Sequence, residues 1–119
     1  MALSVTSSVR KVGGITPAQD ELICAFLQGA VYCWCKNRRD EWFALRDLMG
    51  GDNFFWRGTP LIVLWDKHNG RAADPLKEAA KDAGWLLKKV IDADRRTFES
   101  REEGLVKQYR WTGADGVVE

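Results

Sequence analysis

A few positions of this sequence carry residues that can do chemistry. Cys33-Trp34-Cys35 places two thiols two residues apart, and thiolates bind metals and take part in redox reactions. Asp66-Lys67-His68 sets three titratable side chains in a row, and side chains of these types can act in acid–base chemistry. Farther along, Lys77, Lys81 and Lys88 recur at spacings of four and seven residues, and ammonium groups so spaced on a helix can contact successive phosphates.

The cysteines do not complete a metal site in the sequence. If residues 17–36 form a helix, Cys33 and Cys35 point about 200° apart and cannot share one ion. Cys24 lies on the face of Cys35, but about 16 Å away along the helix axis. The chain has three cysteines and one histidine, and it contains no C-x-x-C pair. We therefore expect buried or half-buried thiols, with no metal and no cofactor, and keep a metal or redox role as the alternative.

The run Asp66-Lys67-His68 does not predict an active site. Adjacent positions on a helix do not converge on one point. A single histidine near a helix C-terminus more commonly interacts with the helix dipole. The sequence also lacks the nucleophile elbow, the P-loop, the H-E-x-x-H zinc motif and the dinucleotide-binding fingerprint. It therefore predicts a protein that is not an enzyme.

Composition narrows the class of protein further. The chain has 119 residues, which is the length of one domain. Lysine and arginine number 18 and aspartate and glutamate 17, and this balance excludes a histone-like or polybasic protein. No apolar run approaches the roughly 20 residues of a membrane span, and Met1–Ser8 lacks the regions of a signal peptide. With an odd number of cysteines, these features predict a cytoplasmic protein with no membrane contact.

Prolines mark the beginnings of helices. Each proline follows a residue that can cap a helix, in Thr16-Pro17, Thr59-Pro60 and Asp74-Pro75. Gln19 completes a capping box with Thr16. Together with apolar spacing, these signals predict helices over 17–36, 40–49, 60–68 and 75–92.

The C-terminal region changes to the alternating pattern of strands. Residues 96–111 predict a two-stranded hairpin, with Glu103-Gly104 as its loop and Phe98 opposite Tyr109. The expected fold is α+β, mainly α-helical, with four helices and a C-terminal β-hairpin. We expect one domain over 16–111 and a flexible tail over 112–119. Residues 1–15 fit either a flexible arm or an edge strand.

This order of elements resembles the winged-helix (winged helix-turn-helix) superfamily over residues 59–111. In that resemblance, 60–68 is the turn helix, 75–92 the recognition helix and 96–111 the wing. The segment 56–60 (Trp-Arg-Gly-Thr-Pro), together with the helix and wing after it, is similar in pattern to terminal winged modules of phage and mobile-element replication proteins. The resemblance implies a nucleic-acid-binding or assembly module of a DNA-handling system. The connection over 69–74 is longer than the tight turn typical of the motif.

The predicted recognition helix offers a face for double-stranded DNA. Its polar side carries lysines that can contact phosphates, a tryptophan and a glycine over which a backbone can approach, namely Lys77, Lys81, Gly84, Trp85 and Lys88. Arg101 and Lys107 of the hairpin would flank the duplex. Residues 75–111 hold nine basic and seven acidic side chains, so a solvated helix face without a ligand remains the alternative.

A protein partner is the second functional class. Phe54, Phe55 and Trp56 fall in an expected loop and, with Trp85, can form an aromatic surface for another protein or for a second copy of the chain as a homodimer. The alternative is that these rings close over the core from outside. An exposed apolar patch would favour the interaction.

Overall fold

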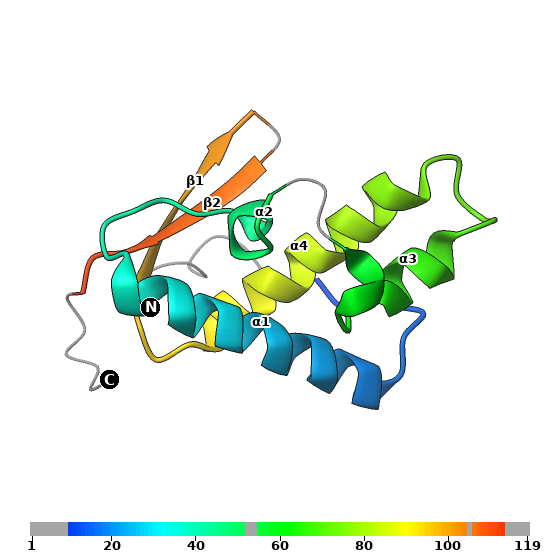
Figure 1. Cartoon of the computed structure of the whole chain (residues 1–119), viewed down its shortest axis with the longest axis horizontal. Helices are drawn as coiled ribbons and strands as arrows, with labels where there is room; N and C mark the ends of the chain where they lie inside the picture. The colour runs from blue at the N-terminus through cyan, green and yellow to red at the C-terminus, as the bar shows by residue number, and fades with distance from the viewer. Residues whose placement is uncertain (1–9, 52–54, 105, 114–119) are drawn as a thin grey trace.

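The computed structural model describes residues 10–51, 55–104 and 106–113 of the chain. It is a mixed α+β fold, mainly helical, with a C-terminal antiparallel two-stranded hairpin, as expected from the sequence. In chain order the elements are α1 (Pro17–Asn37), α2 (Leu45–Leu48), the 3-10 helix η1 (Trp56–Gly58), α3 (Ile62–His68), α4 (Pro75–Ala93), β1 (Phe98–Glu103) and β2 (Val106–Trp111) (Figure 1).

Helix α1 begins at the predicted capping box. The Thr16 hydroxyl accepts a hydrogen bond from the Gln19 backbone N–H at 3.1 Å, and the Gln19 side-chain oxygen accepts one from the Thr16 N–H at 2.9 Å. Both bonds satisfy N–H groups that the start of a helix otherwise leaves unpaired. The buried stripe of α1 repeats every fourth residue, at Ile23, Leu27, Val31 and Cys35.

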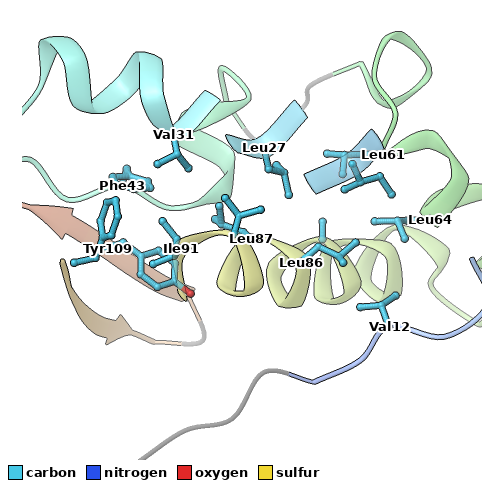
Figure 2. Close-up of a cluster of buried hydrophobic side chains, with 14 of the residues drawn as sticks. Val12, Leu27, Val31, Phe43, Leu61, Leu64, Leu86, Leu87, Ile91 and Tyr109 are labelled. Atoms are coloured by element: carbon cyan, nitrogen blue, oxygen red, sulfur yellow. The ribbon is translucent and has the colours of Figure 1, made fainter. Parts of the chain in front are cut away.

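Helix α4 forms the centre of the core. The Asp74 carboxylate caps its start by accepting from the Lys77 N–H at 3.1 Å, as the Asp74-Pro75 pair predicts. α4 packs against both α1 and α3. Figure 2 shows its apolar side chains facing those of α1 and the hairpin end of the molecule, with Leu86, Leu87 and Ile91 on α4 and Leu27, Val31, Phe43 and Tyr109 across from them.

The predicted helix over 40–49 is wrong for most of its length. Only Leu45–Leu48 is helical, and the segment before it is extended. The Phe43 N–H donates to the Tyr109 carbonyl and the Tyr109 N–H donates to the Phe43 carbonyl, both at 2.9 Å. Pairing with β2 buries the Phe43 ring, which is 0% exposed, and this long-range contact outweighs the local helical pattern.

The hairpin forms where the sequence predicts it, but its register differs. Phe98 pairs with Trp111, and Tyr109 lies opposite Ser100. The loop therefore begins at Gly104, one residue later than expected. Gly104 has a φ of 63°, which glycine adopts without steric cost. The observed register pairs the buried Phe98 with the buried Trp111 on the core side of the hairpin.

The N-terminal segment packs on the helices without forming a strand in its described part, 10–15. Val12 is 6% exposed and belongs to the core. The Lys67 ammonium donates a hydrogen bond to the Gly13 carbonyl, which holds this segment against α3. Residues 1–9 and 114–119, which include most of the expected arm and tail, lie outside the described residues. Among the described helices, none has both the length and the apolar character to cross a membrane.

Candidate nucleic-acid interface

The first half of α4 exposes the lysines that the sequence singled out. Lys77 and Lys81 are both solvent-exposed. The Lys81 ammonium lies 3.6 Å from the carboxylate of Glu78, and the two side chains are 59% and 40% exposed. An exposed ion pair of this kind contributes little and is easily exchanged for another anion. Both lysines are therefore accessible to a phosphate.

Gly84 lies in the middle of α4, on the same side as these lysines. A Cβ built at Gly84 meets no heavy atom of the described residues within 4 Å, apart from the neighbouring helix backbone. Glycine at a helix interior costs about 1 kcal/mol relative to alanine. No packing contact that a Cβ would make with the described residues requires this glycine, which is itself partly exposed.

Two residues of the predicted surface occupy a different environment. Lys88 is 8% exposed and thus buried, contrary to the expectation that it lies on an open face. Its ammonium lies 5.4 Å from the ring centroid of Trp85, one helical turn earlier. The Arg10 guanidinium lies 4.8 Å from the same ring, and Trp85 packs against the core cluster. The N-terminal segment, far away in sequence, therefore covers part of this face.

Arg101 and Lys107 project from opposite faces of the hairpin. Arg101 pairs with Gln108 in the register, while Lys107 pairs with Glu102. Because side chains alternate along a strand, Lys107 shares the face of the buried Tyr109, and Arg101 lies on the outer face. The two side chains therefore lie on opposite faces of the hairpin, so a duplex that packs on one face would contact only one of them.

The outer face of the hairpin carries a tryptophan–arginine cluster that the sequence did not reveal. The guanidinium carbons of Arg101 and Arg110 lie 4.2 and 4.7 Å from the ring centroid of Trp42. Trp42 falls within the helix that the sequence predicts over 40–49. Its true position follows from the bridge between Phe43 and Tyr109, which sets Trp42 opposite Arg110.

The aromatic side chains of the segment around Phe55 are only partly exposed to solvent. Phe54 lies outside the described residues. Phe55 is 73% exposed, and its ring lies so close to Gly58 that a Cβ there would be 2.8 Å from it. Trp56 packs against the core cluster and is partly buried. Among the described residues of the expected aromatic surface, Phe55 is exposed, whereas Trp56 and Trp85 contact the core.

Lys67 and His68 do converge on one point, contrary to the expectation from their adjacent positions. The Lys67 ammonium and the His68 Nε2 each lie 2.8 Å from the same carboxylate oxygen of Asp82. Asp82 belongs to α4, so the two side chains reach across the α3–α4 contact to a residue that is not on their own helix. This cluster joins the two helices.

All three cysteines are free thiols in different environments. Cys35 is buried and Cys24 half-buried, as expected, whereas Cys33 is exposed, which corrects the expectation for that residue. Burial, with the hydrogen bond to Asp20, raises the pKa of Cys24 to about 11. Cys33 lines a groove of about 330 Å³ between the end of α1 and α2. No group of metal-binding side chains occurs among the described residues.

The element order of the described chain is compatible with a winged-helix-like shape, since α3 and α4 precede an antiparallel hairpin. No protein-family model matches the chain, and no curated protein or solved structure matches it either. The function is therefore inferred from the surface residues and their chemistry.

Proposed function

We propose that this domain is a nucleic-acid-binding module of winged-helix type, which acts within a DNA-handling system of the phage or mobile-element kind. The first half of α4, with the exposed Lys77 and Lys81 and the partly exposed Gly84, is its principal contact surface. Arg101 on the outer face of the hairpin is a second contact. Lys88 and Lys107 have no part in this proposal, because one is buried and the other lies on the opposite face of the hairpin.

Gly84 is the observation that carries the proposal. Its position lowers helix stability by about 1 kcal/mol relative to alanine, and the described chain offers no steric reason for it. A phosphate backbone that lies across the helix at this point supplies such a reason, because a methyl group would hold it away. Lys77 and Lys81 precede Gly84 by two turns and by one turn on the same side of the helix, where they can pair with successive phosphates next to the contact.

The size of the molecule suits a duplex. Its longest axis measures 45 Å, somewhat more than the ~34 Å of one turn of B-DNA. In Figure 1 this axis is horizontal, and the tip of the hairpin and the first half of α4 both lie on the upper side of the molecule.

The proposed domain binds its ligand and has no catalytic step or cofactor. We place it in the cytoplasm, in keeping with three free thiols, because a reducing compartment keeps cysteines in that form.

Titration of a fluorescently labelled duplex of about 20 base pairs, followed by anisotropy, tests the proposal. Contacts from Lys77, Lys81 and Arg101 would neutralise three phosphates, so affinity should fall about 40-fold between 50 and 200 mM salt. The variant Lys77→Ala/Lys81→Ala should bind more weakly and show a smaller salt dependence. Absence of binding at 50 mM salt, or equal binding by the variant, would contradict the proposal.

Phe55 supports a second candidate, a protein–protein interface. An aromatic ring that is 73% exposed is a typical anchor for a partner. If a second copy of the chain is that partner, light scattering should give the mass of a dimer at micromolar concentration, and Phe55→Ser should give the mass of a monomer. A monomeric wild-type protein would exclude the homodimer.

A further inference from the structure

Trp42 and Gln108 hold the guanidinium of Arg101 in a fixed position on the outer face of the hairpin. The Arg101 Nε donates to the Gln108 side-chain oxygen at 2.7 Å. The carbon of the same guanidinium lies 4.2 Å from the centroid of the Trp42 ring. The cation is thus held both by a hydrogen bond and by contact with an aromatic ring.

The charge of Arg101 is the least compensated in this cluster. Arg110 donates from Nε to the Glu99 carboxylate at 2.8 Å and is neutralised by it. Arg101 instead uses a neutral amide oxygen, and its nearest carboxylate, on Glu103, lies 4.0 Å away. Within the described residues its two terminal amino groups make no hydrogen bond, and its side chain is 43% exposed.

We infer that Trp42 and Gln108 are positioning residues that orient Arg101 to donate both terminal amino groups to one phosphate of a bound nucleic acid. The two parallel N–H groups of a guanidinium match the spacing of phosphate oxygens. The contact with Trp42 and the hydrogen bond to Gln108 restrict the Arg101 side chain before binding, so less entropy is lost when the phosphate binds. This inference rests on the proposed function and adds residues to it that lie outside α4.

A role in orienting Arg101 accounts for a tryptophan at position 42, at the edge of the hairpin. A half-buried ring beside β2 adds little to the core, since the core cluster does not include it. The ring instead contacts the two arginines. Cation–π contacts at exposed sites contribute modestly, so the benefit expected from the ring is a several-fold change in affinity rather than loss of folding.

A double-mutant cycle on duplex binding tests the inference. Arg101→Ala should weaken binding about five- to tenfold and reduce the slope of log K against log salt by about one. Trp42→Leu should weaken binding about three- to fivefold in the wild-type background and have no effect in the Arg101→Ala background. Trp42→Phe keeps a ring and should bind nearly as well as wild type.

Further variants distinguish the positioning role of Trp42 and Gln108 from the charge of Arg101 and from effects on folding. Arg101→Lys keeps the positive charge but lacks the two parallel donors of the guanidinium. Compared with Arg101→Ala, it should therefore recover the wild-type salt slope but not the wild-type affinity. Gln108→Leu alters only the hairpin surface and should behave as Trp42→Leu does. Arg57→Ala, at an exposed arginine on η1, is the charge-matched control and should bind as wild type does.

Several outcomes would overturn the inference. If Trp42→Leu weakens binding equally with and without Arg101, Trp42 does not act through that arginine. If the wild-type protein binds the duplex and Arg101→Ala binds equally well, the inference fails while the proposed function stands. If polyglutamate competes as well as the duplex, the group recognised is a carboxylate and not a phosphate. If the wild-type protein binds no duplex, the proposed function and this inference fail together.

Discussion

The guanidinium of Arg96 lies 2.9 Å from the carboxylate of Asp94, and the side chains of these residues are only 6% and 2% exposed. Gln28 of α1 donates to the same carboxylate at 2.7 Å. The rings of Trp111 and Tyr32 lie 5.1 and 5.6 Å from the guanidinium carbon. This buried ion pair therefore joins the turn after α4 to both α1 and the hairpin, and it fixes where the hairpin leaves the helices.

Replacing Arg96 by alanine should destabilise the fold strongly. The change leaves the Asp94 charge buried without its partner, which typically costs about 3–5 kcal/mol. Urea unfolding followed by circular dichroism measures the loss. The neighbouring exposed arginine gives the control, because Arg95→Ala should change stability by no more than about 0.5 kcal/mol. A loss below about 1 kcal/mol for Arg96→Ala would show that the pair does not hold the hairpin in place.

The contact between Asp20 of α1 and Lys89 of α4 should make stability depend on pH in the acid range. The Lys89 ammonium donates to Asp20 at 2.8 Å, and this bond lowers the pKa of that carboxyl below its usual value. Because the folded-state pKa is lower than the unfolded one, the contribution is present above the unfolded pKa and is lost as pH falls through the folded pKa. Lys89 is half exposed, so the contribution is modest, about 0.5–1 kcal/mol.

Asp20→Asn should therefore be less stable than wild type at pH 7, and the difference should disappear as the pH is lowered from 5 toward 2. Thermal unfolding at a series of pH values measures it. Glu21→Gln removes the next charge on α1 and should leave the pH profile as it is in the wild type. A difference that is the same at pH 2 and pH 7 would show that the charge of Asp20 does not stabilise the fold.

Gly84→Ala should raise stability and weaken nucleic-acid binding together. An added methyl group meets nothing in the described chain, so the helix should gain up to about 1 kcal/mol. The same group would stand between the helix and a phosphate backbone, and duplex affinity should fall at least threefold. Gly29→Ala in α1 is the control, because Gly29 is an exposed helical glycine at which a Cβ likewise meets no atom of the described residues. Gly29→Ala should raise stability and leave binding unchanged. If Gly84→Ala binds the duplex as well as Gly29→Ala does, Gly84 does not lie at the contact.

Cys33 should be the cysteine that alkylating reagents modify in the folded protein. Cys35 is buried, and the raised pKa of Cys24, about 11, keeps that thiol protonated at pH 8. Mass spectrometry after brief treatment with iodoacetamide should therefore show one adduct, and Cys33→Ser should show none. Modification of Cys24 at a similar rate would contradict the burial of that side chain.

Local signals in the sequence were sufficient to place the long helices. The pairs Thr16-Pro17 and Asp74-Pro75 fix the start of α1 and α4 through hydrogen bonds within three residues, so no knowledge of the rest of the fold is needed. The extended segment around Phe43 was not predictable in this way. Its conformation depends on Tyr109, which lies far along the chain. The hairpin register was ambiguous for a related reason, since Gly104 suits either loop and the burial of Trp111 decides between them.

The candidate surface was predictable where the helix alone determines exposure. Lys77 and Lys81 are exposed as their helical positions indicate. Trp85 is covered by Arg10, and Trp42 receives Arg101 and Arg110, through contacts between segments distant in sequence. A helical wheel contains no information on such contacts. The arginine–tryptophan pairs therefore became visible only in the folded structure.

The most direct test of the proposed function is a map of the contact surface by ¹H–¹⁵N correlation spectroscopy during titration with a duplex of about 20 base pairs. We expect the amide signals of residues 77–84 and of the outer face of the hairpin around Arg101 to shift progressively as duplex is added. Signals around Gly29 on α1 should stay in place. The proposal would be contradicted if no signals shift at 50 mM salt, or if the shifts gather around Phe55 and leave α4 unchanged.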